Sequence, residues 1–179
     1  MSLRLLHRGR PAPGFTLVEL LVTAAVLVVV SSVSFPNVVR FYEDQKLRQA
    51  AIELQSQLQR GRTLAQRLQT GCTLAISAGG AGSAVQVSGT DACAAANLQA
   101  LNLSTVTGVR GLSLTCSGSG CTTPVAINFL PLGVLAGDPQ TLFLAGTATA
   151  TQFCVDLNLT LIRVGFRNGS SGACTYSRS

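Results

Sequence analysis

A run of 25 residues from Phe15 to Val39 contains one ionisable side chain, Glu19, and no lysine or arginine. As a helix, a segment of this length crosses the roughly 30 Å hydrocarbon core of a bilayer. We therefore expect residues 15–39 to form a transmembrane helix. The basic leader before it, residues 1–14, is too short to be a domain, so we expect it to stay in the cytoplasm while the rest of the chain is exported.

Two other interpretations of this segment are a cleaved secretory signal and a generic signal anchor. The apolar core of a secretory signal is about 7 to 15 residues long, whereas this run continues past Ala25 into Val26–Val30. In a generic anchor Glu19 would be incidental. A carboxylate at the centre of a membrane helix costs about 2.5 to 3.5 kcal/mol on insertion scales, so we expect Glu19 to have a cationic partner.

The composition argues against an enzyme. Charged residues make up 11% of the chain, the formal net charge is +6, and the single histidine, His7, lies in the leader. The serines are scattered, and no base is available to activate one of them. Cys116 and Cys121 lack the histidines and the CxxC spacing typical of a zinc site. We therefore expect no catalytic site, no cofactor and no metal.

The N-terminal segment carries a recognisable motif, Gly14-Phe15-Thr16-Leu17-Val18-Glu19, between a short basic leader and an apolar helix. It resembles the class III signal of the type IV pilin family, which includes the pseudopilins of type II secretion. The resemblance implies that a prepilin peptidase cuts between Gly14 and Phe15 and methylates the new terminus at Phe15. Glu19 then becomes the fifth residue, and Pro36 falls where many type IV pilins also carry a proline.

Glu19 has a physical role available in such a chain. Cleavage would expose an α-amino group on Phe15 at membrane depth, and the carboxylate four residues along is the nearest counter-charge. At about 4 Å, this attraction rises from about 1 kcal/mol in water to about 4 kcal/mol at an effective dielectric constant of 20. Glu19 of one subunit can therefore pair with the amino terminus of its neighbour, and the resemblance implies the same role in filament assembly.

Helical periodicity continues beyond Pro36, which we expect to kink the helix because it lacks an amide proton and clashes with the preceding turn. We predict an amphipathic helix over residues 40–70, ending near Gln69. Its apolar stripe consists of Leu47, Ala51, Leu54, Leu58, Gly61, Ala65 and Leu68. A coiled-coil seam is the alternative, but the small residues favour close packing against a sheet.

From Gly71 the periodicity changes to two, which predicts a β-rich domain over residues 71–179. The predicted strands are 72–77, 84–88, 111–116, 125–130, 141–144, 152–157 and 160–166, with a short helical or irregular excursion at 92–99. Most links are too short for helical crossovers, so the sheet should be antiparallel. The expected fold class is α+β, a long N-terminal helix packed on an antiparallel β-sheet domain, the lollipop of the pilin family.

Within that family the second half is most similar to the H-type pseudopilins of type II secretion and the minor pilins of the FimT and FimU kind. The segment Ile127-Asn128-Phe129-Leu130-Pro131-Leu132-Gly133 resembles their strand followed by a Pro and Gly turn. Many members carry Gly-Arg-x-Arg near a late strand. The nearest equivalent here is Arg163-Val164-Gly165-Phe166-Arg167, which lacks the first glycine.

All six cysteines follow the apolar segment, on the side where disulfides form and persist. Six cysteines allow 15 pairings, so the sequence leaves the connectivity open. Cys116 and Cys121 flank a short Ser-Gly loop able to close as a local bridge. The remaining bridges would then be Cys154–Cys174, tying the tail to a strand, and Cys72–Cys93.

Three late arginines suggest a competing function. Arg163 and Arg167 would point to one face of a strand, about 13 Å apart, with Arg178 on the tail. They are candidate phosphate contacts, because minor pilins of the FimT kind are implicated in DNA capture during natural transformation. Against this, residues 71–179 hold four arginines and three aspartates, a net charge of +1 that is too small to demand nucleic acid.

The sequence thus predicts a minor pilin or pseudopilin, a structural subunit of a type IV pilus or of a secretion pseudopilus. Its expected partners are other pilin subunits, the prepilin peptidase, the inner-membrane assembly platform and the lipid bilayer. Its expected location is the inner membrane, with the N-terminus cytoplasmic and the C-terminal domain periplasmic, and then the filament. The alternatives are a DNA-binding minor pilin and a membrane-anchored exported enzyme.

Overall fold

The structure is a computed structural model that describes residues 14–79, 84–109, 111–119, 121 and 124–176; of residues 33–37 it describes only the backbone. The chain divides into two compact units, Met1–Val38 and Val39–Ser179. One helix, α1 (Leu17–Leu68), begins in the first unit and ends in the second. All strands of the described residues belong to the second unit.

Helix α1 is 52 residues long and is continuous through Pro36. It starts two residues after the predicted start at Phe15 and ends one residue before Gln69. Apolar side chains between Leu17 and Val30 are largely exposed, and the hydroxyls of Thr23 and Ser32 donate to the helix's own carbonyls, at Leu20 and Val29. The two units divide after Val38, two residues beyond Pro36. The direction of the helix on the two sides of Pro36 is therefore not compared, and the kink remains a prediction.

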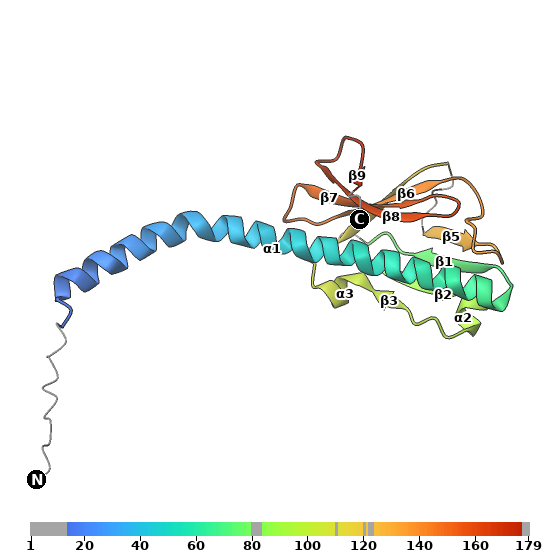
Figure 1. The fold of residues 1–179 in the computed structure, drawn as a ribbon, viewed down its shortest axis with the longest axis horizontal. Helices are drawn as coiled ribbons and strands as arrows, with labels where there is room; N and C mark the ends of the chain where they lie inside the picture. Colours follow the sequence, from blue (N-terminus) through green and yellow to red (C-terminus); the bar gives the residue numbers. More distant parts are fainter. Residues whose placement is uncertain (1–13, 80–83, 110, 120, 122–123, 177–179) are drawn as a thin grey trace, which may run out of the picture. The chain divides into compact units, whose positions relative to one another are not determined.

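The second unit contains two antiparallel sheets (Figure 1). The four-stranded sheet has the order β3-β2-β1-β5, with β1 (Cys72–Ile76), β2 (Gln86–Thr90), β3 (Leu101–Asn102) and β5 (Val125–Phe129). The five-stranded sheet has the order β4-β6-β7-β8-β9, with β4 (Ser113–Ser117), β6 (Gln140–Ala145), β7 (Thr151–Leu157), β8 (Ile162–Asn168) and β9 (Thr175–Tyr176). Both are antiparallel throughout, as the short links predicted.

Each of the seven predicted strands overlaps a strand of the structure, and the predicted α+β class is confirmed. Two very short strands, β3 and β9, were not expected. The excursion at 92–99 contains a short helix, α2 (Asp91–Ala95). A further helix, α3 (Leu103–Thr107), was missed, although its caps are readable: Asn102 accepts a hydrogen bond from the Thr105 amide, and Gly108 ends the helix with φ +65°.

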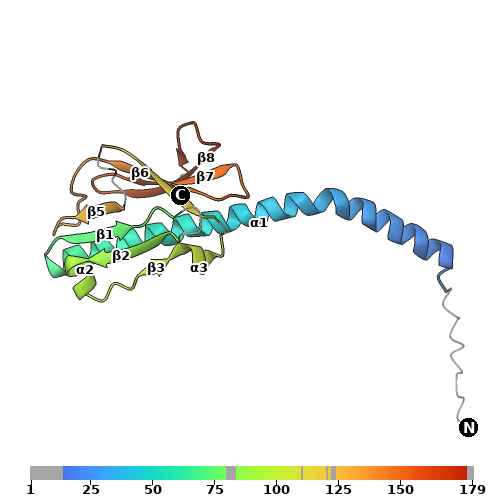
Figure 2. The same ribbon diagram turned by 180° about the vertical axis from the view of Figure 1, so that it is seen from behind.

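The C-terminal half of α1 runs beside β1 and β2 in both views of the fold (Figure 1, Figure 2). Six of the seven residues of the predicted stripe are buried; the exception, Leu68, is 43% exposed at the end of the helix. Gly61 shows why the stripe needs small residues, because a Cβ at this position would lie 2.5 Å from Cδ1 of Leu74 on β1. The packing against a sheet predicted for this stripe is thus what the structure shows.

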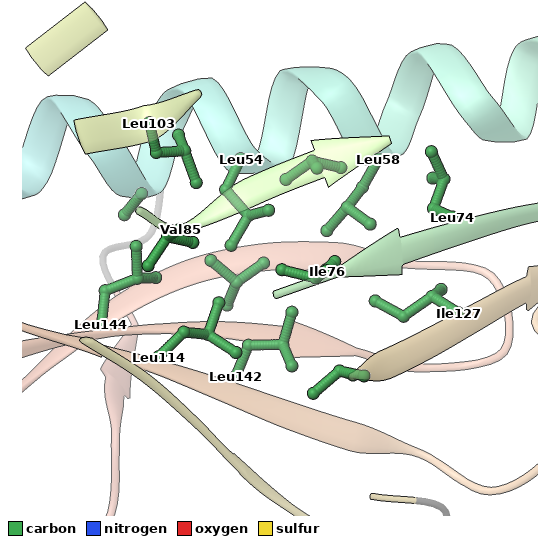
Figure 3. Close-up of a cluster of buried hydrophobic side chains, with 14 of the residues drawn as sticks. Leu54, Leu58, Leu74, Ile76, Val85, Leu103, Leu114, Ile127, Leu142 and Leu144 are labelled. Carbon is green, nitrogen blue, oxygen red and sulfur yellow. The ribbon is translucent and has the colours of Figure 1, made fainter. Parts of the chain in front are cut away.

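One hydrophobic core joins α1 to both sheets. Leu54 and Leu58 of α1 point into it, together with Leu74 and Ile76 of the four-stranded sheet (Figure 3). From the five-stranded sheet come Leu114, Leu142 and Leu144 (Figure 3). Burying a leucine or isoleucine side chain contributes about 1.5 to 3 kcal/mol, so this shared core is what holds the helix onto the sheets.

Candidate functional sites

The N-terminal end of α1 has the geometry of a capped helix. The Thr16 hydroxyl accepts a hydrogen bond from the Glu19 amide at 3.2 Å, which satisfies one of the amides that a helix leaves free at its start. The spacing from Thr16 to Glu19 is that of a capping box, and it places the Glu19 carboxylate in the first turn. The helix therefore begins just after the predicted cleavage point.

The predicted cleavage junction is exposed. Gly14 and Phe15 precede the helix, and Phe15 is 81% exposed. A Cβ added to Gly14 would meet nothing within 4 Å. The rest of the leader, residues 1–13 with Arg4, Arg8 and Arg10, lies outside the described residues. The two described residues of the predicted cleavage junction, Gly14 and Phe15, are thus exposed.

Glu19 is exposed among apolar neighbours, and its carboxylate has no ion-pair partner among the residues that the structure describes. Leu17, Val18, Leu20 and Leu21 around it are each more than half exposed. An isolated carboxylate on an apolar helix surface is available to a cation from outside the chain. Searching the described residues for a helix long and apolar enough to cross a membrane gives no candidate.

The two late arginines lie on one face of β8, as their spacing predicted, with Gly165 between them. Arg163 is exposed, and in the strand register it stands opposite Asp156. Arg167 is half-buried and engaged: its Nε and Nη2 donate to Gln152 Oε1 at 2.9 and 2.6 Å. Arg178, the third candidate, lies outside the described residues. The two candidate arginines that the structure describes therefore differ: Arg163 is exposed, and Arg167 is held within the sheet.

The same face carries a tyrosine that the sequence did not single out. Tyr176 on β9 pairs with Gly165, and a Cβ on Gly165 would lie 2.7 Å from both the Tyr176 ring and the Thr175 carbonyl oxygen. Burial raises the pKa of Tyr176 above 10.0, and the charge of Asp156 raises it further while Arg163 opposes the shift. Gly165 in mid-strand was the sequence signal for this close approach.

Three disulfides link the six cysteines, and they are the pairs favoured above. Cys72–Cys93 joins β1 to α2, with 5.2 Å between the Cα atoms. Cys116–Cys121 closes a short loop after β4. Cys154–Cys174 attaches the segment before β9 to β7, with a Cα separation of 6.4 Å. Among the described residues there is no cluster of histidine, cysteine, aspartate and glutamate side chains suited to a metal ion.

The comparisons with known proteins agree with the N-terminal motif and with the fold. The family model described as "Prokaryotic N-terminal methylation motif" matches residues 10–35. Among solved structures, the chain is similar to the type IV minor pilin FimU of Pseudomonas aeruginosa strain PAO1, with 15% identity and a TM-score of 0.51 over 75% of this chain and 96% of that chain. A search of the curated proteins gave no match.

The FimU likeness bears on the fold, and the motif bears on the first turns of α1. The chain therefore carries the prokaryotic N-terminal methylation motif on a fold similar to that of the type IV minor pilin FimU.

Proposed function

We propose that this chain is a minor pilin that is trimmed between Gly14 and Phe15, methylated at Phe15 and then built into a type IV pilus. The observation that carries the proposal is the exposed junction at Gly14 and Phe15, one turn before a carboxylate without an ion-pair partner among the described residues. A prepilin peptidase needs access to the peptide bond that it cuts. Among the residues that the structure describes, nothing lies within 4 Å of a Cβ built on Gly14, which supports such access.

Residues 15–39 form the membrane anchor in this proposal, with the N-terminus in the cytoplasm and the β-rich domain in the periplasm. Its support is the exposure of apolar side chains over the first turns of α1 and the internal hydrogen bonds of Thr23 and Ser32. A hydroxyl that bonds to its own helix removes a polar group that lipid would leave unsatisfied. The disulfides add support, because they persist in an oxidising compartment.

Assembly in this proposal depends on Glu19. Once the leader is removed, the α-amino group of Phe15 on an incoming subunit pairs with Glu19 of its neighbour, and the pairing sets their register. The partners are then other pilin subunits, the prepilin peptidase and the inner-membrane assembly platform. A pseudopilin of a type II secretion system would use the same steps, and the likeness to the minor pilin FimU makes the pilus our first choice.

Mass spectrometry of the matured chain tests the proposal. We expect the protein purified from membranes to begin at Phe15 with one added methyl group, and a strain without prepilin peptidase to retain residues 1–14. A mature chain that begins at any other residue would refute processing at Gly14. The platform protein of the pilus and that of the secretion system are then deleted one at a time. The deletion after which the processed chain is missing from sheared filaments identifies the system to which the chain belongs.

A further inference from the structure

A groove of about 610 Å³ runs between the C-terminal part of α1 and the segment that follows α2. Arg60 and Arg67 line it from the helix, and Asn97 faces them from the other wall. Leu64 and Leu98 also line it, and both are partly buried against the hydrophobic core. The groove therefore combines an apolar surface with two cationic side chains.

The charge in this groove is uncompensated. No acidic residue is among its lining residues, and neither Arg60 nor Arg67 has an ion-pair or hydrogen-bond partner in the described part of the chain. Arg62 on the same helix differs, because it donates to the Thr160 carbonyl oxygen at 2.6 Å. Residues seven apart on a helix lie on one face, about 10 Å from each other along the axis. The groove thus presents two available guanidinium groups at a fixed spacing.

The two walls are held together by a buried side chain. Gln57 is 3% exposed, and its Nε2 donates to the Gln99 carbonyl oxygen at 2.8 Å. This bond ties α1 to the segment after α2, and Leu64 and Leu98 pack on the core beneath it. The groove is therefore formed before any ligand arrives, which lowers the entropic cost of binding.

We propose that this groove binds an acidic segment of a neighbouring filament subunit; this proposal depends on the function proposed above. Arginine recognises carboxylates through paired, charge-assisted hydrogen bonds. Two carboxylates seven residues apart on a helix match the spacing of Arg60 and Arg67. The stem of such a segment would cover Leu64 and Leu98. Nucleic acid fits less well, because no aromatic side chain lines the groove to stack a base.

The test uses the processed full-length chain in detergent and a labelled helical peptide with two glutamates seven residues apart. Fluorescence anisotropy at low salt compares it with a peptide that has glutamine at both positions. We expect the glutamate peptide to bind about tenfold more tightly, and Arg60→Gln/Arg67→Gln to lose that difference. The matched control is Arg40→Gln/Arg48→Gln, which removes the same charge from exposed positions of α1 and should keep the wild-type affinity.

A variant with the charges of the groove reversed distinguishes loss of the specific ion pairs from loss of binding through misfolding. Arg60→Glu/Arg67→Glu should bind a peptide with two lysines at the same spacing and reject the glutamate peptide. Unchanged binding of the glutamate peptide by Arg60→Gln/Arg67→Gln overturns the proposal, and so does the absence of any binding by the wild type. Binding of an oligodeoxythymidine that requires both arginines, without peptide binding, overturns it in favour of nucleic acid.

The N-terminal mass of the same sample separates this proposal from the one it depends on. A chain that begins at methylated Phe15 but ignores the acidic peptide overturns the groove alone. A chain that retains its leader when the peptidase is present overturns the minor-pilin function instead.

Discussion

The Arg167 guanidinium lies 3.7 Å from the centroid of the Phe143 ring, so a cation of β8 covers an aromatic ring of β6. Gln152, on the strand between them, stands opposite Arg167 in the register and accepts two of its N–H groups. The three side chains form one cluster across the outer face of the five-stranded sheet. Arg167 therefore stabilises the sheet, whatever else it binds.

Arg167→Gln should lower the free energy of unfolding by about 1 to 2 kcal/mol, because it removes a cation–π contact and two hydrogen bonds. Urea denaturation of the β-rich domain measures this change. Arg163→Gln is the control: Arg163 is exposed on the same strand, so its loss should change stability by less than about 0.5 kcal/mol. Equal destabilisation by the two variants would contradict a special role for Arg167.

The same two variants address the competing function. If the chain binds DNA through this face, a salt-sensitive gel shift should weaken with Arg163→Gln, which leaves the fold intact. A shift that weakens only with Arg167→Gln would instead reflect a disturbed sheet. Absence of any shift at low salt would remove DNA as a partner of this face.

Glu19→Ala should leave cleavage after Gly14 intact and reduce the amount of the chain in sheared filaments. The reason is that the variant removes the one acidic group of the first helical turn, which in the proposed assembly pairs with the terminal amine of a neighbouring subunit. Immunoblotting of membrane and filament fractions gives the comparison. Glu53→Ala, an acid on the same helix within the second unit, should assemble normally. Wild-type incorporation of Glu19→Ala would rule out the pairing.

The disulfides should protect all six cysteines from alkylation in the unreduced protein, so intact mass should not change with iodoacetamide. In the chain-entropy view a longer closed loop gives more stabilisation. Replacing both Cys154 and Cys174 by serine should therefore cost about 3 kcal/mol, and replacing Cys116 and Cys121 about 2 kcal/mol. Thermal unfolding of the two variants checks this order, and the reverse order would contradict it.

Gly165→Ala should detach β9 from β8, because the added methyl group would meet the Thr175 carbonyl and the Tyr176 ring. With its burial lost, the pKa of Tyr176 should fall back toward 10.0, as ultraviolet titration of the phenolate would show. In the wild type this pKa is raised by folding, so its contribution to stability is complete below pH 10.0 and is lost as pH rises through the folded value. An unchanged titration in Gly165→Ala would argue against this packing.

Features with a local cause could be read from the sequence. The stripe from Leu47 to Ala65 predicted which face of α1 is buried, because helical spacing alone aligns those side chains. Strands with alternating apolar residues were predicted in a similar way, because a period of two aligns their apolar side chains on one face. The strands β3 and β9, each two residues long, carry too few residues to show a period, so they escaped detection.

Features that depend on contacts between residues far apart in the sequence could not be predicted from the sequence. Arg167 was predicted to share a face of the strand with Arg163, but its partners Gln152 and Phe143 come from other strands, and only the pairing of those strands identifies them. The groove at Arg60 and Arg67 likewise needs the segment after α2, which is held by Gln57. The helical periodicity of residues 40–70 gave no reason to pair Arg60 with Arg67.

Strand β9 pairs with Gly165 and Phe166 on the outer edge of β8, and the Cys154–Cys174 bridge secures the segment that leads into β9. An uncovered edge invites strands of other molecules to add on, which leads to aggregation of the kind that ends in amyloid. With the bridge closed, Gly165 and Phe166 already have their backbone partner. Closing the Cys154–Cys174 bridge thus protects this part of the β8 edge from pairing with a strand of another molecule.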